Sequence, residues 1–145
     1  MKRRSALQLG GSMLLTALAG CSLSDSLAPA EVTVSEITIR NRLERAVEVS
    51  VLLTASDEIV LWRTVTVPTA PNQFVTFDDL PAEPRKYTLY AQVPTSDTDD
   101  PIQADLVEDA GDQSCLEVRL EITSNPQNDR SEPTLVYGSI GQCNR

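Results

Sequence analysis

The sequence predicts an all-β protein, a single antiparallel β-sandwich of about seven strands behind an N-terminal export signal. From residue 31 onward, short runs rich in β-branched residues alternate with turn residues. No run keeps an apolar period of 3.6 residues for long enough to predict a helix. Residues 31–145 amount to about 115 residues, the size of one domain. Short strands at this spacing favour two packed sheets.

Each strand follows from its own alternation pattern. Residues 32–34 and 37–39 alternate, but the phase changes at Ser35-Glu36, which predicts a β-bulge or a strand that changes sheets. Residues 47–53 alternate cleanly and predict a half-buried strand, whereas 59–67 are apolar on both faces around Trp62. Four more strands are predicted at 73–77, 87–93, 116–122 and about 134–140.

Residues 1–20 have the order of an export signal. A positively charged start that contains Arg3 and Arg4 precedes an uncharged apolar run over 7–19, and small residues come just before Cys21. An apolar helix of about 13 residues, at roughly 1.5 Å per residue, is too short to cross a hydrocarbon core of about 30 Å. The run is therefore interpreted as a signal peptide and not as a membrane span.

Two short motifs in this leader resemble known export signals. Leu18-Ala19-Gly20-Cys21 resembles the lipobox of bacterial and archaeal lipoproteins, which implies that Cys21 carries a diacylglyceryl group and becomes the mature N-terminus. Arg3-Arg4 resembles the twin-arginine motif of the Tat pathway, with Sec export as the alternative. The resemblance implies a signal peptide over 1–20, a lipidated linker over 21–30 and a domain over 31–145, held at the extracellular face of the membrane.

The composition is strongly acidic. The chain has a net charge of −9, and removal of residues 1–20 takes away three basic residues and no acidic one, which leaves −12 and a single lysine, Lys86. Such a surface stays hydrated in concentrated salt, where screening mutes self-repulsion. Together with the leader, it resembles the surface lipoproteins of halophilic archaea. The same balance argues against nucleic acid as a partner, because no basic patch can displace phosphate counterions.

The segment 80–89 resembles the Leu-x-Pro…Tyr-x-Val corner of fibronectin type III domains. This resemblance implies an Ig-like sandwich in which the hydroxyl of Tyr87 bonds back to the corner backbone. Trp62, on the predicted third strand, resembles the core tryptophan of immunoglobulin strand C. The inter-sheet cysteines of that family are missing, so the resemblance extends to architecture and not to a function.

Three cysteines are present, and lipidation of Cys21 leaves two. Outside the cytoplasm, Cys115 and Cys143 are expected to form a disulfide. A redox-active thiol pair is the alternative, although no Cys-x-x-Cys spacing supports it. An antiparallel hairpin centred on Asp129 gives the facing pairs Cys115–Cys143, Val118–Ile140 and Ile122–Val136.

The residue inventory favours a protein without catalytic or cofactor chemistry. The chain has no histidine, which excludes His-dependent triads and a blue-copper site. Zinc would need carboxylates and thiols that are already paired, and no phosphate-binding loop is present. No catalytic residue, cofactor or metal site is therefore predicted. A calcium site in the long segment 94–113 remains an alternative, because seven acidic residues crowd it: Asp97, Asp99, Asp100, Asp105, Glu108, Asp109 and Asp112.

Two functions follow as expectations. The first is a non-enzymatic surface module, Ig-like and lipid-anchored, that binds another envelope protein or serves structurally. The second is an accessory lipoprotein that binds a solute or ion through the acidic loop 94–113. A pocket lined by Trp62, Tyr87 or Tyr90 beside that loop would favour the second function, and a filled core with only flat exposed sheets would favour the first.

Overall fold

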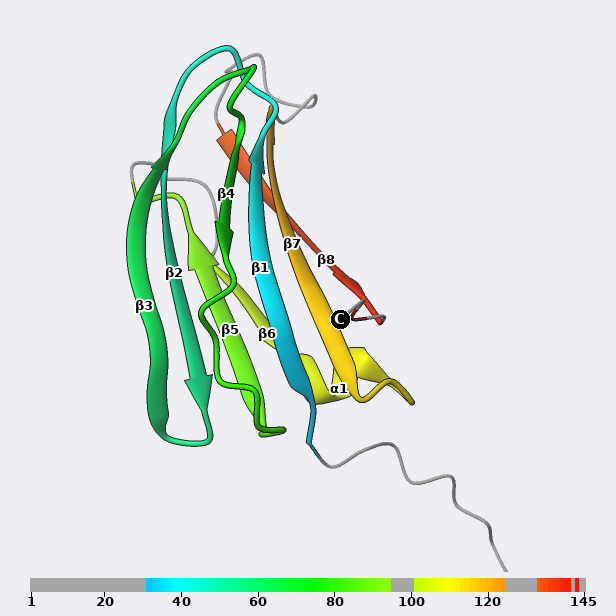
Figure 1. Cartoon of the computed structure of the whole chain (residues 1–145). Coiled ribbons are helices and arrows are strands. Elements are labelled where there is room, and N and C mark those ends of the chain that lie inside the picture. The colour runs from blue at the N-terminus through cyan, green and yellow to red at the C-terminus, as the bar shows by residue number, and fades with distance from the viewer. Residues whose placement is uncertain (1–30, 95–100, 125–132, 142, 144–145) are drawn as a thin grey trace, which may run out of the picture.

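The computed structural model describes residues 31–94, 101–124, 133–141 and 143, which form eight strands and one short helix. Two four-stranded sheets pack face to face as a sandwich (Figure 1), so the predicted all-β sandwich is confirmed. The elements are β1 (Thr33–Asn41), β2 (Val47–Ala55), β3 (Glu58–Val67), β4 (Phe74–Phe77), β5 (Tyr87–Gln92), β6 (Ile102–Asp105), α1 (Leu106–Ala110), β7 (Cys115–Ser124) and β8 (Pro133–Ile140).

The strands are ordered β4-β1-β7-β8 in one sheet and β3-β2-β5-β6 in the other. We call them the β1 sheet and the β2 sheet. Every pairing is antiparallel except that of β1 with β7, which is parallel. This parallel pair departs from the fully antiparallel sandwich that the sequence predicts. It arises because the chain finishes the β2 sheet with β6 and then crosses over to add β7 beside β1.

The core lies between the sheets, and strand alternation explains its composition. In β7, Leu116, Val118, Leu120 and Ile122 are at most 1% exposed, while the intervening residues face outward. In β2, alternate residues from Val47 to Ala55 are buried in the same way. Full burial of one such aliphatic side chain contributes roughly 1.5–3 kcal/mol, so the inward faces of these strands supply the main drive for folding.

The phase change in the first strand is a β-bulge, as predicted. The register of β1 against β7 shifts between Val34 and Glu36, so that Ser35 is the extra residue. Because of this extra residue, Val34 and Ile37 both point into the core although they lie three positions apart.

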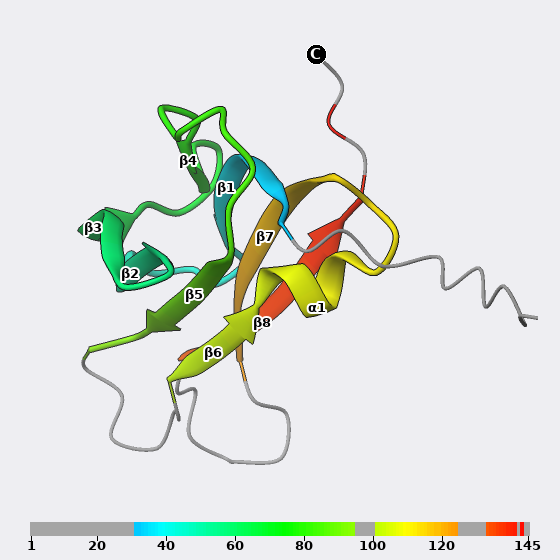
Figure 2. The ribbon, with the colours of Figure 1, turned by 90° about the horizontal axis from the view of Figure 1, so that it is seen from below.

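The described part of the segment 94–113, residues 101–113, forms two elements that the sequence did not predict. It contains β6, which pairs with β5, and α1, which contacts β5, β6 and β7 at one end of the sandwich (Figure 2). Asp105 caps α1, since its Oδ1 accepts hydrogen bonds from the backbone N–H groups of Val107 and Glu108 at 3.0 and 3.2 Å. Ala104 and Leu106 are buried, which explains why the segment packs on the core despite its acidic composition.

The predicted register of the last hairpin is wrong by one residue. Val118 lies opposite Ser139 and not Ile140, and Ile122 lies opposite Leu135 and not Val136. A shift of one residue exchanges the two faces of a strand. Leu135 therefore packs in the core, whereas Val136 and Ile140 are 49% and 36% exposed.

The expectation that Trp62 is a core residue is also wrong. Trp62 is 67% exposed on β3, the edge strand of the β2 sheet, while Leu61 and Val67 on the same strand are buried. Both faces of β3 carry apolar residues. The face that carries Leu61 and Val67 points into the core, so Trp62 points outward.

Candidate functional site

The residues expected to direct export and lipidation lie outside the described part of the chain. They are Arg3 and Arg4 of the export motif and Leu18, Ala19, Gly20 and Cys21 of the lipobox. The first described residues, 31 and 32, lie at the end of the sandwich where β1 begins (Figure 1).

The disulfide between Cys115 and Cys143 is present, as predicted. The two Cα atoms are 5.8 Å apart, within the usual range of about 4.4–6.8 Å. The pair forms despite the corrected register. Ile140, the last residue of β8, lies opposite Glu117 near the start of β7, and Cys143 lies beyond the end of the strand, where the paired register no longer holds it. The bond ties the C-terminal end of the chain to the sandwich.

Tyr87 forms the predicted tyrosine corner. Its side chain is 1% exposed, and its hydroxyl donates a hydrogen bond to the backbone carbonyl of Glu83 at 3.2 Å. Burial raises the pKa of Tyr87, the nearby charge of Arg85 lowers it and that of Glu83 raises it. Tyr87 is therefore a structural residue of the core and does not face a binding surface.

Three described carboxylates of the acidic segment, those of Asp105, Asp109 and Asp112, are engaged locally. Asp105 caps α1, and Asp109 accepts a hydrogen bond from the hydroxyl of Tyr137 at 2.8 Å, which ties α1 to β8. Asp112 accepts from the side-chain amide of Gln113 at 3.1 Å. Among residues 31–94, 101–124, 133–141 and 143, no three His, Cys, Asp or Glu side chains are placed to hold a metal ion. Asp97, Asp99 and Asp100 lie outside these ranges.

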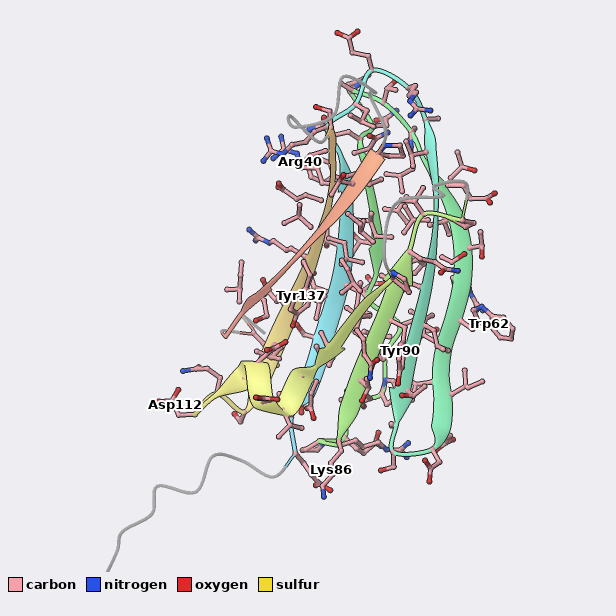
Figure 3. All side chains as sticks on the ribbon, turned by 180° about the vertical axis from the view of Figure 1, so that it is seen from behind. Arg40, Trp62, Lys86, Tyr90, Asp112 and Tyr137 are labelled. Carbon is pink, nitrogen blue, oxygen red and sulfur yellow. A yellow bond between two sulfur atoms is a disulfide. The ribbon has the colours of Figure 1, made fainter. Side chains whose placement is uncertain are left out.

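An apolar row crosses the outer face of the β2 sheet. Leu52 on β2 lies directly opposite Trp62 on β3 and opposite Tyr90 on β5, and Tyr90 in turn lies opposite Gln103 on β6. Residues in facing positions point to the same side of a sheet, so the three apolar side chains form one continuous row. Figure 3 shows Trp62 projecting from the sandwich and Tyr90 near the middle of the same sheet.

The row of Trp62, Leu52 and Tyr90 has a neighbouring row on each side. Neither neighbouring row carries an ionisable side chain on β2, β3 or β5. Ser50 lies opposite Thr64 and Gln92, and Thr54 lies opposite Ile59 and Thr88. We call the three rows the neutral face. Among the described residues, charges occur at its margins, with Glu48 beyond the first row, Lys86 beyond the third and Asp105 at the β6 end of the third. The neutral face consists of Ser50, Leu52, Thr54, Ile59, Trp62, Thr64, Thr88, Tyr90, Gln92 and Gln103.

The neutral face is hollowed between its two aromatic side chains. A groove of about 320 Å³ is bounded by Trp62 and Tyr90, with Leu52 at its base. Pro101, at the start of the segment that leads into β6, forms one of its borders. A pocket lined by Trp62, Tyr87 or Tyr90 was the feature expected to favour a solute-binding protein, and the groove includes Trp62 and Tyr90 but not Tyr87. The sequence did not single out Leu52 or Pro101, which the fold brings to the groove.

The outer face of the β1 sheet has the opposite character. Its facing pairs include Glu36 with Glu117 and Arg40 with Glu121. Arg42 donates two hydrogen bonds of 2.9 Å to the carboxylate of Glu121, and this contact holds the pKa of Glu121 below its usual value. One outer face is thus covered by charges and ion pairs, while the other has none at its centre.

Comparison with known proteins does not assign the chain to a group, since no family model and no curated protein matches it. The described part of the chain includes no helix with the length and apolar character needed to cross a membrane. The described residues therefore define the protein only as a β-sandwich in which the centre of one outer face is aromatic and uncharged.

Proposed function

We propose that this protein is a non-enzymatic, lipid-anchored protein at the extracellular face of the cell membrane, where its sandwich binds a component of the envelope. The observation that carries the proposal is the neutral face. Aromatic side chains without nearby charges are typical of the centres of binding surfaces. On a chain of net charge −9, three adjacent uncharged rows around Trp62 and Tyr90 indicate a surface that is desolvated in use.

The proposed location is supported by the leader sequence. The lipobox-like Leu18-Ala19-Gly20-Cys21 supports a two-chain lipid anchor, which holds a protein at a membrane far more firmly than one acyl chain does. The Arg3-Arg4 pair supports Tat export, and the acidic composition supports a halophilic source. A Cys21→Ser variant is expected to be released from the membrane or to remain unprocessed. A variant that is still membrane-bound and cleaved before residue 21 would overturn the anchor.

The second candidate is an accessory lipoprotein that binds a solute, and the groove favours it. Trp62 and Tyr90 line this groove beside Pro101, which belongs to the segment 94–113. The proposed binding surface is then the groove, since the carboxylates of Asp105 and Asp109 are engaged in the fold.

A photo-crosslinking experiment in whole cells tests the proposed surface. A photoreactive phenylalanine derivative replaces Gln92 at the rim of the neutral face of the full-length lipoprotein, and Glu117 on the opposite outer face in a matched control. Crosslinked products are expected from position 92 and not from position 117. Products from position 117 alone, or from neither position, would overturn the proposed surface.

A further inference from the structure

We propose that the groove on the neutral face binds an uncharged glycan, with a sugar ring held between Trp62 and Tyr90. This inference rests on the proposed function, because it names the chemical class of the envelope component that the face binds. A sugar ring offers two apolar C–H faces and a circumference of hydroxyl groups. The site must therefore supply apolar walls at its centre and uncharged hydrogen-bonding groups at its edge.

The side chains of Trp62 and Tyr90 are spaced so that one sugar ring fits between them. Trp62 and Tyr90 both lie opposite Leu52, so their strands are separated by one intervening strand, or roughly 10 Å between backbones. The side chain of Leu52 is shorter than its two neighbours and leaves the groove of about 320 Å³ between them. This volume lies at the lower end of the roughly 300–1,000 Å³ found for small-molecule sites. The faces of aromatic rings are apolar and carry partial negative charge, which suits the C–H bonds of a sugar.

The rim supplies hydroxyl and amide groups. Ser50 and Thr64 face each other across β2 and β3, and their hydroxyl oxygens are 2.8 Å apart. The amide of Gln92 borders the other side of the groove on β5, and the exposed Gln103 lies beyond Tyr90 on β6. Each amide both donates and accepts hydrogen bonds, as a sugar hydroxyl also does. The rim therefore matches a ligand with many hydroxyl groups and no net charge.

The charge distribution selects among ligands. Among the described residues, a phosphate or a carboxylate would find no cationic side chain on the three rows of the neutral face, and an ammonium group would find only Asp105 at the β6 end of the third row. Arg63 follows Trp62 in β3, but it alternates to the other side of the strand, and its Nη1 donates to the carbonyl oxygen of Trp62 at 3.0 Å. A neutral glycan thus fits the face better than an acidic glycan or a charged headgroup does.

The tryptophan itself reports on the site, because Trp62 is the only tryptophan in the chain. The mature lipoprotein, purified in detergent micelles, is titrated with neutral oligosaccharides of hexoses and N-acetylhexosamines while Trp62 fluorescence is recorded. At least one neutral series is expected to give a saturable change in emission. Matched oligosaccharides that contain uronic acids are expected to bind at least tenfold more weakly. Equal binding of the acidic series would overturn the charge argument.

Two variants locate the binding. Tyr90→Ala keeps the reporter and is expected to weaken binding at least tenfold, while Val136→Ala, an exposed aliphatic residue on the opposite sheet, leaves it unchanged. Trp62→Ala is expected to abolish retention on immobilised oligosaccharide. Since Trp62 is 67% exposed, the thermal midpoint of this variant should stay near that of the parent, which separates lost binding from lost folding. Unchanged retention by Trp62→Ala would overturn the inference.

The outcomes also separate this inference from the proposed function. If no neutral oligosaccharide binds and the crosslinked product from position 92 is a polypeptide, the glycan inference is wrong and the proposed surface stands. If position 92 gives no product in cells and no oligosaccharide binds, both are wrong. A crosslinked product that is sensitive to glycosidase and resistant to protease on the partner side supports both.

Discussion

Removal of the disulfide should destabilise the domain by an amount that follows from the length of the loop it closes. Cys115 and Cys143 are separated by 28 positions and enclose the β7–β8 hairpin. In the chain-entropy model, a cross-link that closes a loop of about 29 residues removes enough freedom from the unfolded chain to stabilise the native state by about 3.5 kcal/mol. Both half-buried side chains are replaced by a residue of similar size in the double variant Cys115→Ser/Cys143→Ser.

The effect is large enough to measure by heat or by denaturant. A domain of about 115 residues unfolds with an entropy of roughly 0.24 kcal/mol/K, so a loss of about 3.5 kcal/mol lowers the melting temperature by about 14 °C. Guanidinium titration of the oxidised parent and the double variant gives the same difference as a free energy of unfolding. A changed slope in that titration would show that the bond acts through the compactness of the unfolded chain.

The reduced parent is the matched control. Dithiothreitol should bring the parent to the stability of the double variant and leave the double variant unaffected. A difference below about 1 kcal/mol would refute the loop-entropy reasoning, and it would mean that the β7–β8 pairing already restrains the unfolded chain. Free thiols in protein purified oxidised from membranes would refute the pairing itself.

Three other predictions concern hydrogen bonds, pH and metal. Tyr87→Phe keeps the buried ring but leaves the Glu83 carbonyl without its donor, so denaturant titration should show a loss of about 1 kcal/mol. Burial and the hydrogen bond to Asp109 raise the pKa of Tyr137 above its ordinary value of 10.0, so this tyrosine stabilises the fold fully below that pH and progressively less above it. Melting temperatures of the parent should therefore fall above about pH 10, and those of Tyr137→Phe should fall less steeply. Calcium should not raise the melting temperature, and a clear rise would restore the ion-binding alternative.

The strand pattern was predictable wherever one face of a strand is apolar and the other polar. Such alternation located β2 and β7, and the break at Ser35 located the bulge in β1. A short sequence resemblance located the tyrosine corner at Tyr87, and the cysteine count located the disulfide. For β2 and β7 the alternation leaves one structural solution, because burying the opposite face would place polar groups in the core.

The sequence could not determine structure where both faces of a strand are apolar. In β8, Leu135, Val136 and Ile140 offer apolar residues in both phases, so the pattern does not select a register. In the register that the structure adopts, Leu135 is buried and Tyr137 donates a hydrogen bond to Asp109, a residue 28 positions away in the sequence. The pair β6 and α1 was missed for a related reason, since their buried Ala104 and Leu106 stand among acidic residues.

Asn41 shows a third limit, because no local pattern marks it. It is fully buried, and its amide donates hydrogen bonds to the carbonyl oxygens of Arg45, Val67 and Pro68 while its Oδ1 accepts from the N–H of Leu43. These bonds join the end of β1 to the end of β3. The partners are up to 27 positions away, so their convergence follows only from the packing of the two sheets.

The exposure of Trp62 bears most directly on function, because the fold does not require a tryptophan at that position. The alternate face of β3 already supplies Leu61 and Val67 to the core, so a threonine would serve as well at position 62 in an edge strand. A single exposed apolar residue is common and needs no explanation. Trp62 differs because it lies in register with Leu52 and Tyr90, on a face whose centre carries no charge in an acidic chain. Cross-strand contacts among these side chains contribute at most about 1 kcal/mol each to the stability of the sheet, and the absence of charge around them is what supports the proposed binding surface.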